Sequence, residues 1–181
     1  MNYKEISLQI RIKIYEKILH RDSMKLKLER YRLDGAKIGE NVIAFSPISS
    51  AESYLISVED NVTISTGVKF CTHDNSAIKI YDTGTDFVGE IFIWNNSFIG
   101  MNSILLPGVK IASNCIVGAG SVVTKSFLEK GSVIAGNPAR IVGNINTIKG
   151  KRKDNLFDFK NLNYKQKREC ILDNQEKWVI K

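Results

Sequence analysis

The chain has 181 residues, of which 43% are hydrophobic and 25% are charged, a composition typical of one ordinary globular domain with short appendages. No apolar run approaches the ~18 residues that a membrane-spanning helix needs, and charges interrupt the first segment where a secretory signal would be apolar. We therefore expect a cytoplasmic protein. The three cysteines, Cys71, Cys115 and Cys170, are widely spaced and predict reduced thiols rather than a disulfide framework or a zinc site.

The net charge of +7 is concentrated at the two ends of the chain. Residues 1–32 hold nine Lys/Arg against four acidic residues and residues 149–181 hold ten against five, whereas the middle is net negative. Such ends suit peripheral contact with an anionic membrane surface or an acidic glycan, although an ordinary solvated surface is the simpler interpretation. Because the basic excess is confined to the ends, we predict no nucleic-acid partner.

The first 34 residues predict an N-terminal helical segment that caps the central region of the chain. Residues 3–20 favour a helix, although the alternation of apolar residues between Leu8 and Ile14 is also compatible with a strand. A second alternation, from Met24 to Leu28, is expected to lead into the first strand of the central region. His20 lies in this segment, and we expect it to be a surface residue.

A six-residue repeat dominates the segment 35–145 and is clearest over residues 93–128, which read IWNNSF, IGMNSI, LLPGVK, IASNCI, VGAGSV, VTKSFL. The first position of each hexad is aliphatic, and the fifth is small or apolar. This period is neither the 3.6 of a helix nor the alternation of one long strand, so it predicts an all-β solenoid, a parallel coil of short strands with three hexads per turn. Gly and Asn gather at the second to fourth positions, where the chain must turn and positive φ is needed.

Shifts in the phase of the repeat locate two insertions, at residues 50–57 and 71–92. The second is one long excursion loop, and a loop of about twenty residues in a compact domain is usually functional. His73, in the motif FCTHDNSA, stands where this loop leaves the coil. Imidazole has the pKa that suits removal of a proton from an alcohol near neutral pH, so His73 is a candidate general base, with a simple surface histidine as the alternative.

The motif FCTHDNSA, the run FIGMNSILLPGVKIASNCIVGAGSVVTK and the sequence VIAGNPARIV together resemble the hexapeptide acetyltransferase family. Within it they are similar to the sugar O-acetyltransferases of maltose, galactoside and surface-polysaccharide type. The resemblance implies a left-handed parallel β-helix over residues 35–145, assembled as a homotrimer. It also implies acetyl-CoA as cosubstrate, bound in the groove between neighbouring subunits, with a sugar or polysaccharide acceptor and no metal.

The same resemblance implies roles for individual residues. His73 would be the general base for direct attack of a sugar hydroxyl on the thioester. The expected cofactor-binding residues are Ala119, Thr124, Lys125 and Arg140, with Phe98 beside the pantetheine arm. Trp94 stands where the family has a glycine, and it is a candidate stacking platform for the acceptor ring. Asp74 is placed with the acceptor site, but adjacent side chains of an extended segment point to opposite faces, so the group that orients His73 stays open.

Several alternatives remain at this point. An N-acetyltransferase acting on an amino-sugar nucleotide is the nearest. A serine O-acetyltransferase and an antibiotic-inactivating acetyltransferase would share the fold and cofactor site and differ only in the acceptor. A non-catalytic β-helix scaffold belongs to a different class. A γ-class carbonic anhydrase is excluded because its zinc needs three histidines and the chain has two. The remaining residues, 146–181, form a basic C-terminal tail that we expect to be helical between Asn161 and Ile180.

Overall fold

The computed structural model describes residues 3–18 and 23–179, and the chain divides into two compact units, residues 1–144 and residues 145–181. The first unit begins with helix α1 (Tyr3–Lys13), a π-helical turn (Ile14–Ile18) and helix α2 (Met24–Leu33). Its strands are β1 (Lys37–Ile38), β2 (Ile43–Ala44), β3 (Ile56–Val58), β4 (Thr63–Ile64), β5 (Lys69–Phe70), β6 (His73–Asp74), β7 (Phe87–Val88), β8 (Ile91–Ile93), β9 (Phe98–Ile99), β10 (Ile104–Leu105), β11 (Lys110–Ile111), β12 (Ile116–Val117), β13 (Val122–Val123), β14 (Ser132–Gly136) and β15 (Ala139–Asn144).

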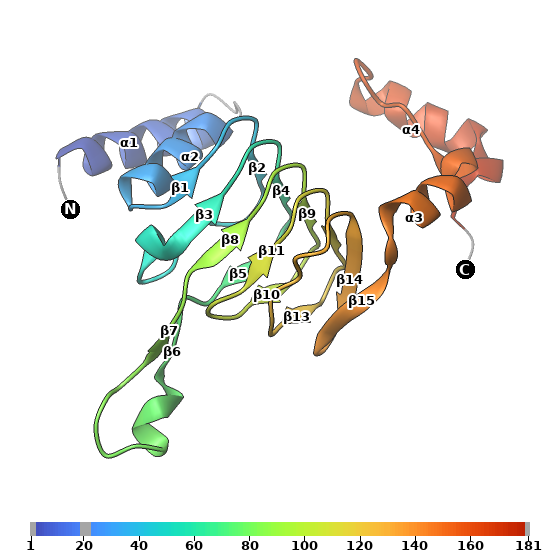
Figure 1. The fold of residues 1–181 in the computed structure, drawn as a ribbon. Helices are drawn as coiled ribbons and strands as arrows, with labels where there is room; N and C mark the ends of the chain where they lie inside the picture. The colour runs from blue at the N-terminus through green and yellow to red at the C-terminus, as the bar shows by residue number, and fades with distance from the viewer. Residues whose placement is uncertain (1–2, 19–22, 180–181) are drawn as a thin grey trace. The chain divides into compact units, whose positions relative to one another are not determined.

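Apart from β6, β7 and β15, these strands form three parallel sheets, and the chain passes through the three sheets in a repeating order. Sheet A has the order β1-β3-β8-β11, sheet B the order β2-β4-β9-β12-β14, and sheet C the order β5-β10-β13. Each passage from A through B to C is one turn of a three-sided coil (Figure 1). The predicted parallel arrangement with helices at the chain ends is therefore confirmed. Strand β15 pairs antiparallel with β14 and ends the coil.

The two inward-facing positions of the repeat form the core. All six residues at the first hexad position are completely buried: Ile93, Ile99, Leu105, Ile111, Val117 and Val123. The fifth position is buried as well, even where it holds a hydroxyl, because Ser97 donates to the carbonyl of Ala112 and Ser103 to that of Gly118, both in the following turn. Small residues at this position thus keep the turns close together without leaving an unsatisfied polar group.

The corners of the coil carry the residues that tolerate positive φ, as the repeat predicts. Asn96, Asn102 and Asn114 all have φ of 57°, and Gly108 and Gly120 have φ of 81° and 70°. Asparagine and glycine adopt this left-handed conformation at low cost, whereas a β-branched residue there would be strained. The hexad therefore specifies the turn as well as the core.

Three boundaries differ from the sequence-based predictions. The Met24–Leu28 stretch is the start of helix α2 rather than a lead into a strand, because three alternating residues are too few to define a period and the helix is rich in Lys, Leu and Arg, which favour helices. Strand β3 begins at Ile56, inside the expected first insertion. The long excursion returns to the coil at Ile91, two residues earlier than expected.

The second unit contains short helices and a polar, basic surface. Its elements are α3 (Ile145–Lys151), a 3-10 turn (Lys153–Asn155), α4 (Tyr164–Asp173) and a 3-10 turn (Gln175–Lys177). Helix α4 starts with a capping box between Asn163 and Gln166 and is shorter than the predicted helix. None of the residues described in this unit is fully buried. Over residues 3–18 and 23–179, every helix is too short or too polar to cross a lipid bilayer.

Replacing the buried Val117 with aspartate tests the register of the coil. We expect Val117→Asp to lower the free energy of unfolding by about 4 kcal/mol or more, because it puts an unpaired carboxylate between two stacked turns. The matched control is Val142→Asp, since Val142 is 63% exposed and its replacement should cost less than about 0.5 kcal/mol. Thermal denaturation of both variants checks the prediction, and a Val117→Asp protein as stable as the control would contradict the register.

Candidate active site

The three-sided coil has three edges, where the chain passes from one sheet to the next. The edge from sheet C to sheet A comprises residues 50–55, 71–90, 106–109 and 124–126; the edge from A to B includes residues 59–62, 94–97 and 112–115; the edge from B to C includes residues 100–103 and 118–121. The long excursion, which contains β6 and β7, leaves and rejoins the coil at the C-to-A edge (Figure 1). His73 opens β6, so the predicted base lies at the root of the excursion.

Backbone pairing fixes this root against the coil. His73 is opposite Val88 in the antiparallel β6–β7 pair, and the amide of Gly89 donates to the carbonyl of Thr72 at 2.9 Å. A side chain on Gly89 would collide with the backbone of Gly108 in the next turn, so only glycine allows the returning strand to approach the coil this closely. The loop beyond this point extends away, but its base is tied to a rigid scaffold.

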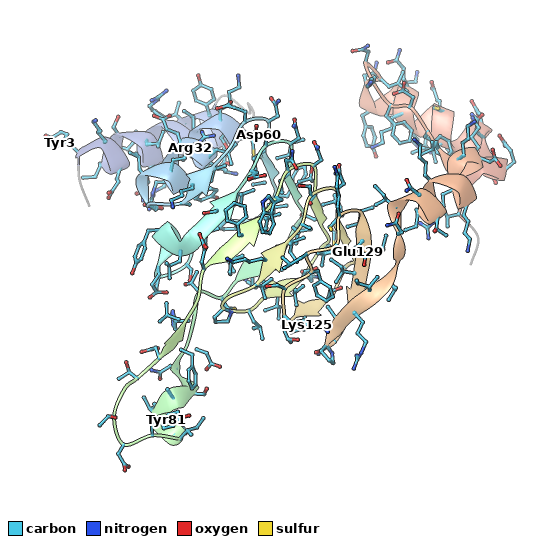
Figure 2. All side chains as sticks on the ribbon, in the orientation of Figure 1. Tyr3, Arg32, Asp60, Tyr81, Lys125 and Glu129 are labelled. Carbon is cyan, nitrogen blue, oxygen red and sulfur yellow. The ribbon has the colours of Figure 1, made fainter. Side chains whose placement is uncertain are left out.

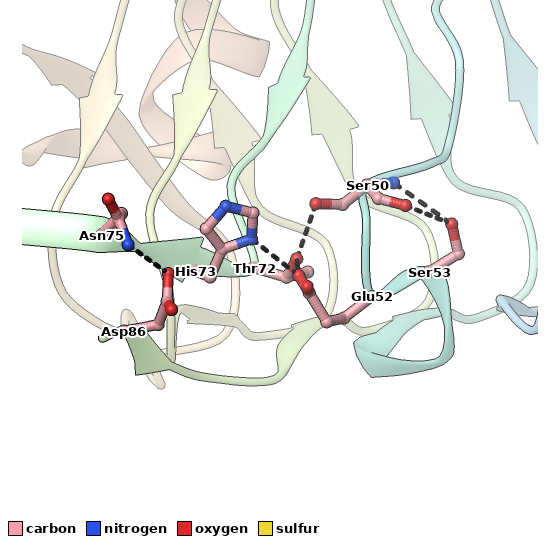
Figure 3. A network of polar contacts seen from close by, with 7 residues as sticks. All are labelled: Ser50, Glu52, Ser53, Thr72, His73, Asn75 and Asp86. Atoms are coloured by element: carbon pink, nitrogen blue, oxygen red, sulfur yellow. Dashed lines mark hydrogen bonds and ion pairs between the residues drawn. The ribbon is translucent and has the colours of Figure 1, made fainter. Parts of the chain in front are cut away.

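A carboxylate from the preceding turn of the coil holds the imidazole. His73 Nδ1 lies 2.8 Å from Glu52 Oε2, and the same oxygen accepts a hydrogen bond from Thr72 Oγ1 at 2.6 Å (Figure 3). Since the Thr72 hydroxyl donates to Glu52, Ser50 Oγ must be the donor in its 2.6 Å contact with Thr72. The hydroxyl of Ser53 donates to the Ser50 carbonyl at 2.9 Å and closes the turn that carries Glu52.

This arrangement selects the tautomer of His73. An ionised carboxylate only accepts hydrogen bonds, so Nδ1 carries the proton and donates it to Glu52, which leaves the lone pair on Nε2. The hydrogen bond to Glu52 raises the pKa of His73, and hydrogen bonds from Thr72 and then His73 lower the pKa of Glu52. The His73 side chain is 39% exposed. A half-exposed imidazole with a free Nε2 and a carboxylate behind it can take a proton from a bound hydroxyl.

The predicted cofactor residues lie along the two edges that border sheet C. Thr124 and Lys125 are on the C-to-A edge, the edge of His73, and both are exposed; Figure 2 labels Lys125. Ala119 lies on the B-to-C edge. Arg140 follows the turn between β14 and β15, which is tied to the same edge by the hydrogen bond from the Gly136 amide to Ser121 Oγ.

Of the other three predicted residues, Phe98 and Trp94 lie elsewhere on the coil, whereas Asp74 follows His73 in β6. Phe98 is on the outer face of sheet B and is 42% exposed. Trp94 lies on the A-to-B edge, so within one chain it is on a different edge from His73. The Asp74 carboxylate accepts a hydrogen bond from the amide of Ser76 at 2.9 Å and caps the short helical turn after it, as expected for a side chain that does not orient the imidazole.

Sequence reasoning missed Glu52, although a signal for it existed. The phase of the repeat located an insertion at residues 50–57, and Glu52 is the only acidic residue in it. A carboxylate one turn before a histidine, on the same edge of a coil, is well placed to bond to the imidazole. To infer this from the sequence, one would have to know that both insertions leave the coil at the same edge. In the part of the chain that the structure describes, no group of three or more His, Cys, Asp or Glu side chains is placed to hold a metal ion. His20 lies outside the described residues.

Comparisons with known proteins agree with the fold. The family described as bacterial transferase hexapeptide (six repeats) matches residues 92–125. Protein CapG of Staphylococcus aureus is 40% identical over 167 residues, which cover 89% of this chain and 94% of that protein. Galactoside O-acetyltransferase of Escherichia coli (strain K12) is 33% identical over 110 residues, 60% of this chain and 54%, about half, of that enzyme.

A solved structure of galactoside acetyltransferase in complex with coenzyme A superposes with a TM-score of 0.57 at 22% identity, covering 83% of this chain and 86% of the other. At 22% identity this structural similarity supports the fold alone. The match to CapG extends over almost the whole length of both proteins. Together with the hexad repeat and the three-sided coil, these likenesses show that the chain belongs to the bacterial hexapeptide-repeat transferase family, in which it resembles the sugar O-acetyltransferases.

Proposed function

We propose that this protein transfers an acetyl group from acetyl-CoA to a sugar hydroxyl, on a surface polysaccharide or its precursor, with His73 as general base. The observation that carries the proposal is the Glu52–His73 pair on the edge that also holds Thr124 and Lys125. An imidazole with a fixed tautomer lies on the same edge of the coil as two of the residues expected to bind coenzyme A. Family membership supports the same reaction type.

The chemistry needs no protein nucleophile. His73 Nε2 removes the hydroxyl proton as the sugar oxygen attacks the thioester carbonyl, and the tetrahedral intermediate collapses to the acetyl ester. The departing thiolate of coenzyme A takes the proton back from the imidazolium. Glu52 lowers the free energy of that imidazolium because it places a negative charge 2.8 Å from Nδ1. Cys71, two residues away, has no role in this scheme.

The cofactor would lie along sheet C. Its phosphates would meet Lys125 and Arg140, two of the seven cations in the otherwise net-negative middle of the chain. Thr124, the backbone at Ala119 and the ring of Phe98 would line the pantetheine arm. Phe98 belongs to another face, so we propose that it comes from a neighbouring subunit.

A homotrimer of left-handed coils would supply that neighbour. The outer face of sheet B presents a column of mainly apolar residues in register, Ile43, Thr63, Phe98 and Ile116, of which Ile43 and Phe98 are 45% and 42% exposed. A stripe of this kind is suited to subunit packing. We place the trimer in the cytoplasm, and contact of its basic ends with an anionic membrane surface stays a prediction.

A screen of different acceptors tests the class of reaction that the protein catalyses. Release of free thiol from acetyl-CoA is measured against monosaccharides, oligosaccharides and polysaccharides, and against amino-sugar nucleotides. Transfer to a sugar hydroxyl supports the proposal. Exclusive transfer to an amino-sugar nucleotide would make the chain an N-acetyltransferase, and no release with any acceptor would favour a non-catalytic scaffold.

Removing the base gives a quantitative prediction. We expect His73→Ala to lower kcat for acetyl transfer by on the order of 10²–10⁴-fold, because the hydroxyl loses its proton acceptor, with little change in acetyl-CoA affinity measured by calorimetry. His20→Ala is the matched control, since it makes the same substitution at the other histidine. Wild-type turnover in His73→Ala would remove this residue from the mechanism.

The role of Glu52 is visible in the pH profile. His73 must be neutral to act as a base, and Glu52 raises its pKa, so kcat/KM should rise with pH through that raised value. Glu52→Gln removes the charge and should move this acidic limb to lower pH, while the plateau falls by about tenfold or more because the tautomer is no longer fixed. The shift can also be read from the NMR titration of His73.

The control for this experiment is Asp74→Asn, which neutralises the carboxylate next to His73 in sequence. Its side chain bonds to the Ser76 amide, and its charge is the weakest of the influences that raise the pKa of His73. We therefore expect a smaller shift than in Glu52→Gln. An equal or larger shift in Asp74→Asn would show that Glu52 is not the positioning residue.

A further inference from the structure

Two aromatic side chains stand together on the outside of the coil, away from the His73 edge. Phe92 lies on the outer face of sheet A, and Trp94 follows two residues later, so both point to the same side. Their ring centroids are 4.6 Å apart with an interplanar angle of 43°, and both side chains are half-buried. No step of the proposed reaction uses this pair.

A groove lies on each side of the aromatic pair. One, of about 330 Å³, is lined by Phe92 and by residues of and after β1 and β3, including Lys37, Glu59 and Asp60. The other, of about 400 Å³, is lined by Trp94 and by residues of the next two turns, including Ser113 and Lys130. Figure 2 labels Asp60 and Glu129, which belong to two turns of this A-to-B edge.

The two grooves and the rings between them touch five successive turns of the coil. Since neighbouring parallel strands lie about 4.8 Å apart, the whole track is about 20 Å long, several times the size of one sugar ring. We call it the A-edge track: Lys37, Ser57, Phe92, Trp94, Lys110 and Lys130. It runs along the coil axis, so it suits an extended chain rather than a compact ligand.

The polar groups of the track suit a ligand rich in hydroxyls. Lys37 and Lys110 stand in the same outer column as Phe92, and in the described part of the chain neither they nor Lys130 forms an ion pair. Of the seven cations in the middle region, three therefore lie on this track. Aromatic rings offer an apolar face to the C–H side of a sugar, and ammonium groups donate hydrogen bonds to its oxygens.

The distribution of charge over the three faces favours a ligand here rather than another subunit. The outer column of sheet B is mainly apolar and suits subunit packing, and the predicted cofactor residues border sheet C. The outer column of sheet A instead holds the exposed Lys37 and Lys110, with the half-buried Phe92 between them. Ser57 in the same column is buried, and its hydroxyl donates to Glu90. Burying ammonium groups that have no ion-pair partner is unfavourable in any subunit contact, so this is the face we expect to stay in solvent.

We propose that the A-edge track is a second glycan-binding site, which holds a neighbouring stretch of an oligosaccharide or polysaccharide acceptor while one sugar of the chain, or of another chain, is acetylated at His73. The proposal rests on the proposed function and specifies its acceptor as an extended glycan. Phe92 and Trp94 form the platform, and the three lysines contact the hydroxyl groups on either side.

The test compares acceptor lengths. Wild type and Phe92→Ala/Trp94→Ala are assayed with the sugar accepted best in the screen and with oligosaccharides built from it, starting with galactose and galacto-oligosaccharides. We expect the ratio of kcat/KM for the longest acceptor to kcat/KM for the single sugar to fall by about tenfold in the double variant. Tyr3→Ala, which removes an aromatic ring that is 92% exposed on α1, should leave the ratio at its wild-type value.

A binding measurement separates this inference from the proposed reaction. In a Trp178→Phe background Trp94 is the only tryptophan, so its fluorescence reports the track directly, even when His73→Ala has removed transfer. Saturable, length-dependent changes on addition of galacto-oligosaccharides support the site whether or not the chain acetylates them. An unchanged length ratio together with unchanged fluorescence would overturn the inference, as would a change of oligomeric state in the double variant, which would make the pair a subunit contact.

Discussion

The structure depends on the packing of one aliphatic residue and one small residue from each hexad onto their equivalents one turn away. The first-position residues from Ile93 to Val123 are completely buried, and each apolar side chain of this size contributes about 1.5–3 kcal/mol when it leaves water. Because every contact joins equivalent positions of successive turns, the register cannot slip without exposing both columns. The same stacking aligns the corners, so residues far apart in the sequence share an edge.

That alignment explains how an active site can be built from separate insertions. Glu52 and His73 come from different turns, yet each leaves the coil between sheet C and sheet A, and the repeat places them one above the other. Thr124 lies on the same edge, two turns after His73, in a part of the repeat that has no insertion. The rigid coil sets the spacing along the edge, whereas the insertions provide the side chains that a plain hexad lacks. Polar chemistry is therefore concentrated where the repeat is interrupted.

Much of this was predictable from the sequence, because the repeat is strictly local. The buried columns, the Asn and Gly corners and the position of His73 follow from six-residue windows. The partner of His73 did not follow, since it depends on how two insertions with different phases stack, and no window contains both. The helix at Met24–Leu33 was missed for the opposite reason: its few alternating residues resemble a strand locally, and the burial of Leu26 and Leu28, two residues apart, follows the same spacing even in the helix.

The three faces of the coil have different surfaces although they share one repeat, and the outward positions account for this difference. The core restricts only two positions in six, so the residues between them are free to vary from face to face. The outward positions of sheet B form an apolar stripe, and those of sheet C lie beside the predicted cofactor residues. The outward positions of sheet A place lysines around Phe92 and Trp94. Trp94 in particular stands at a corner of the coil, where its half-buried ring lies 4.6 Å from the ring of Phe92. Its position next to Phe92, between two grooves, is what a binding role would require.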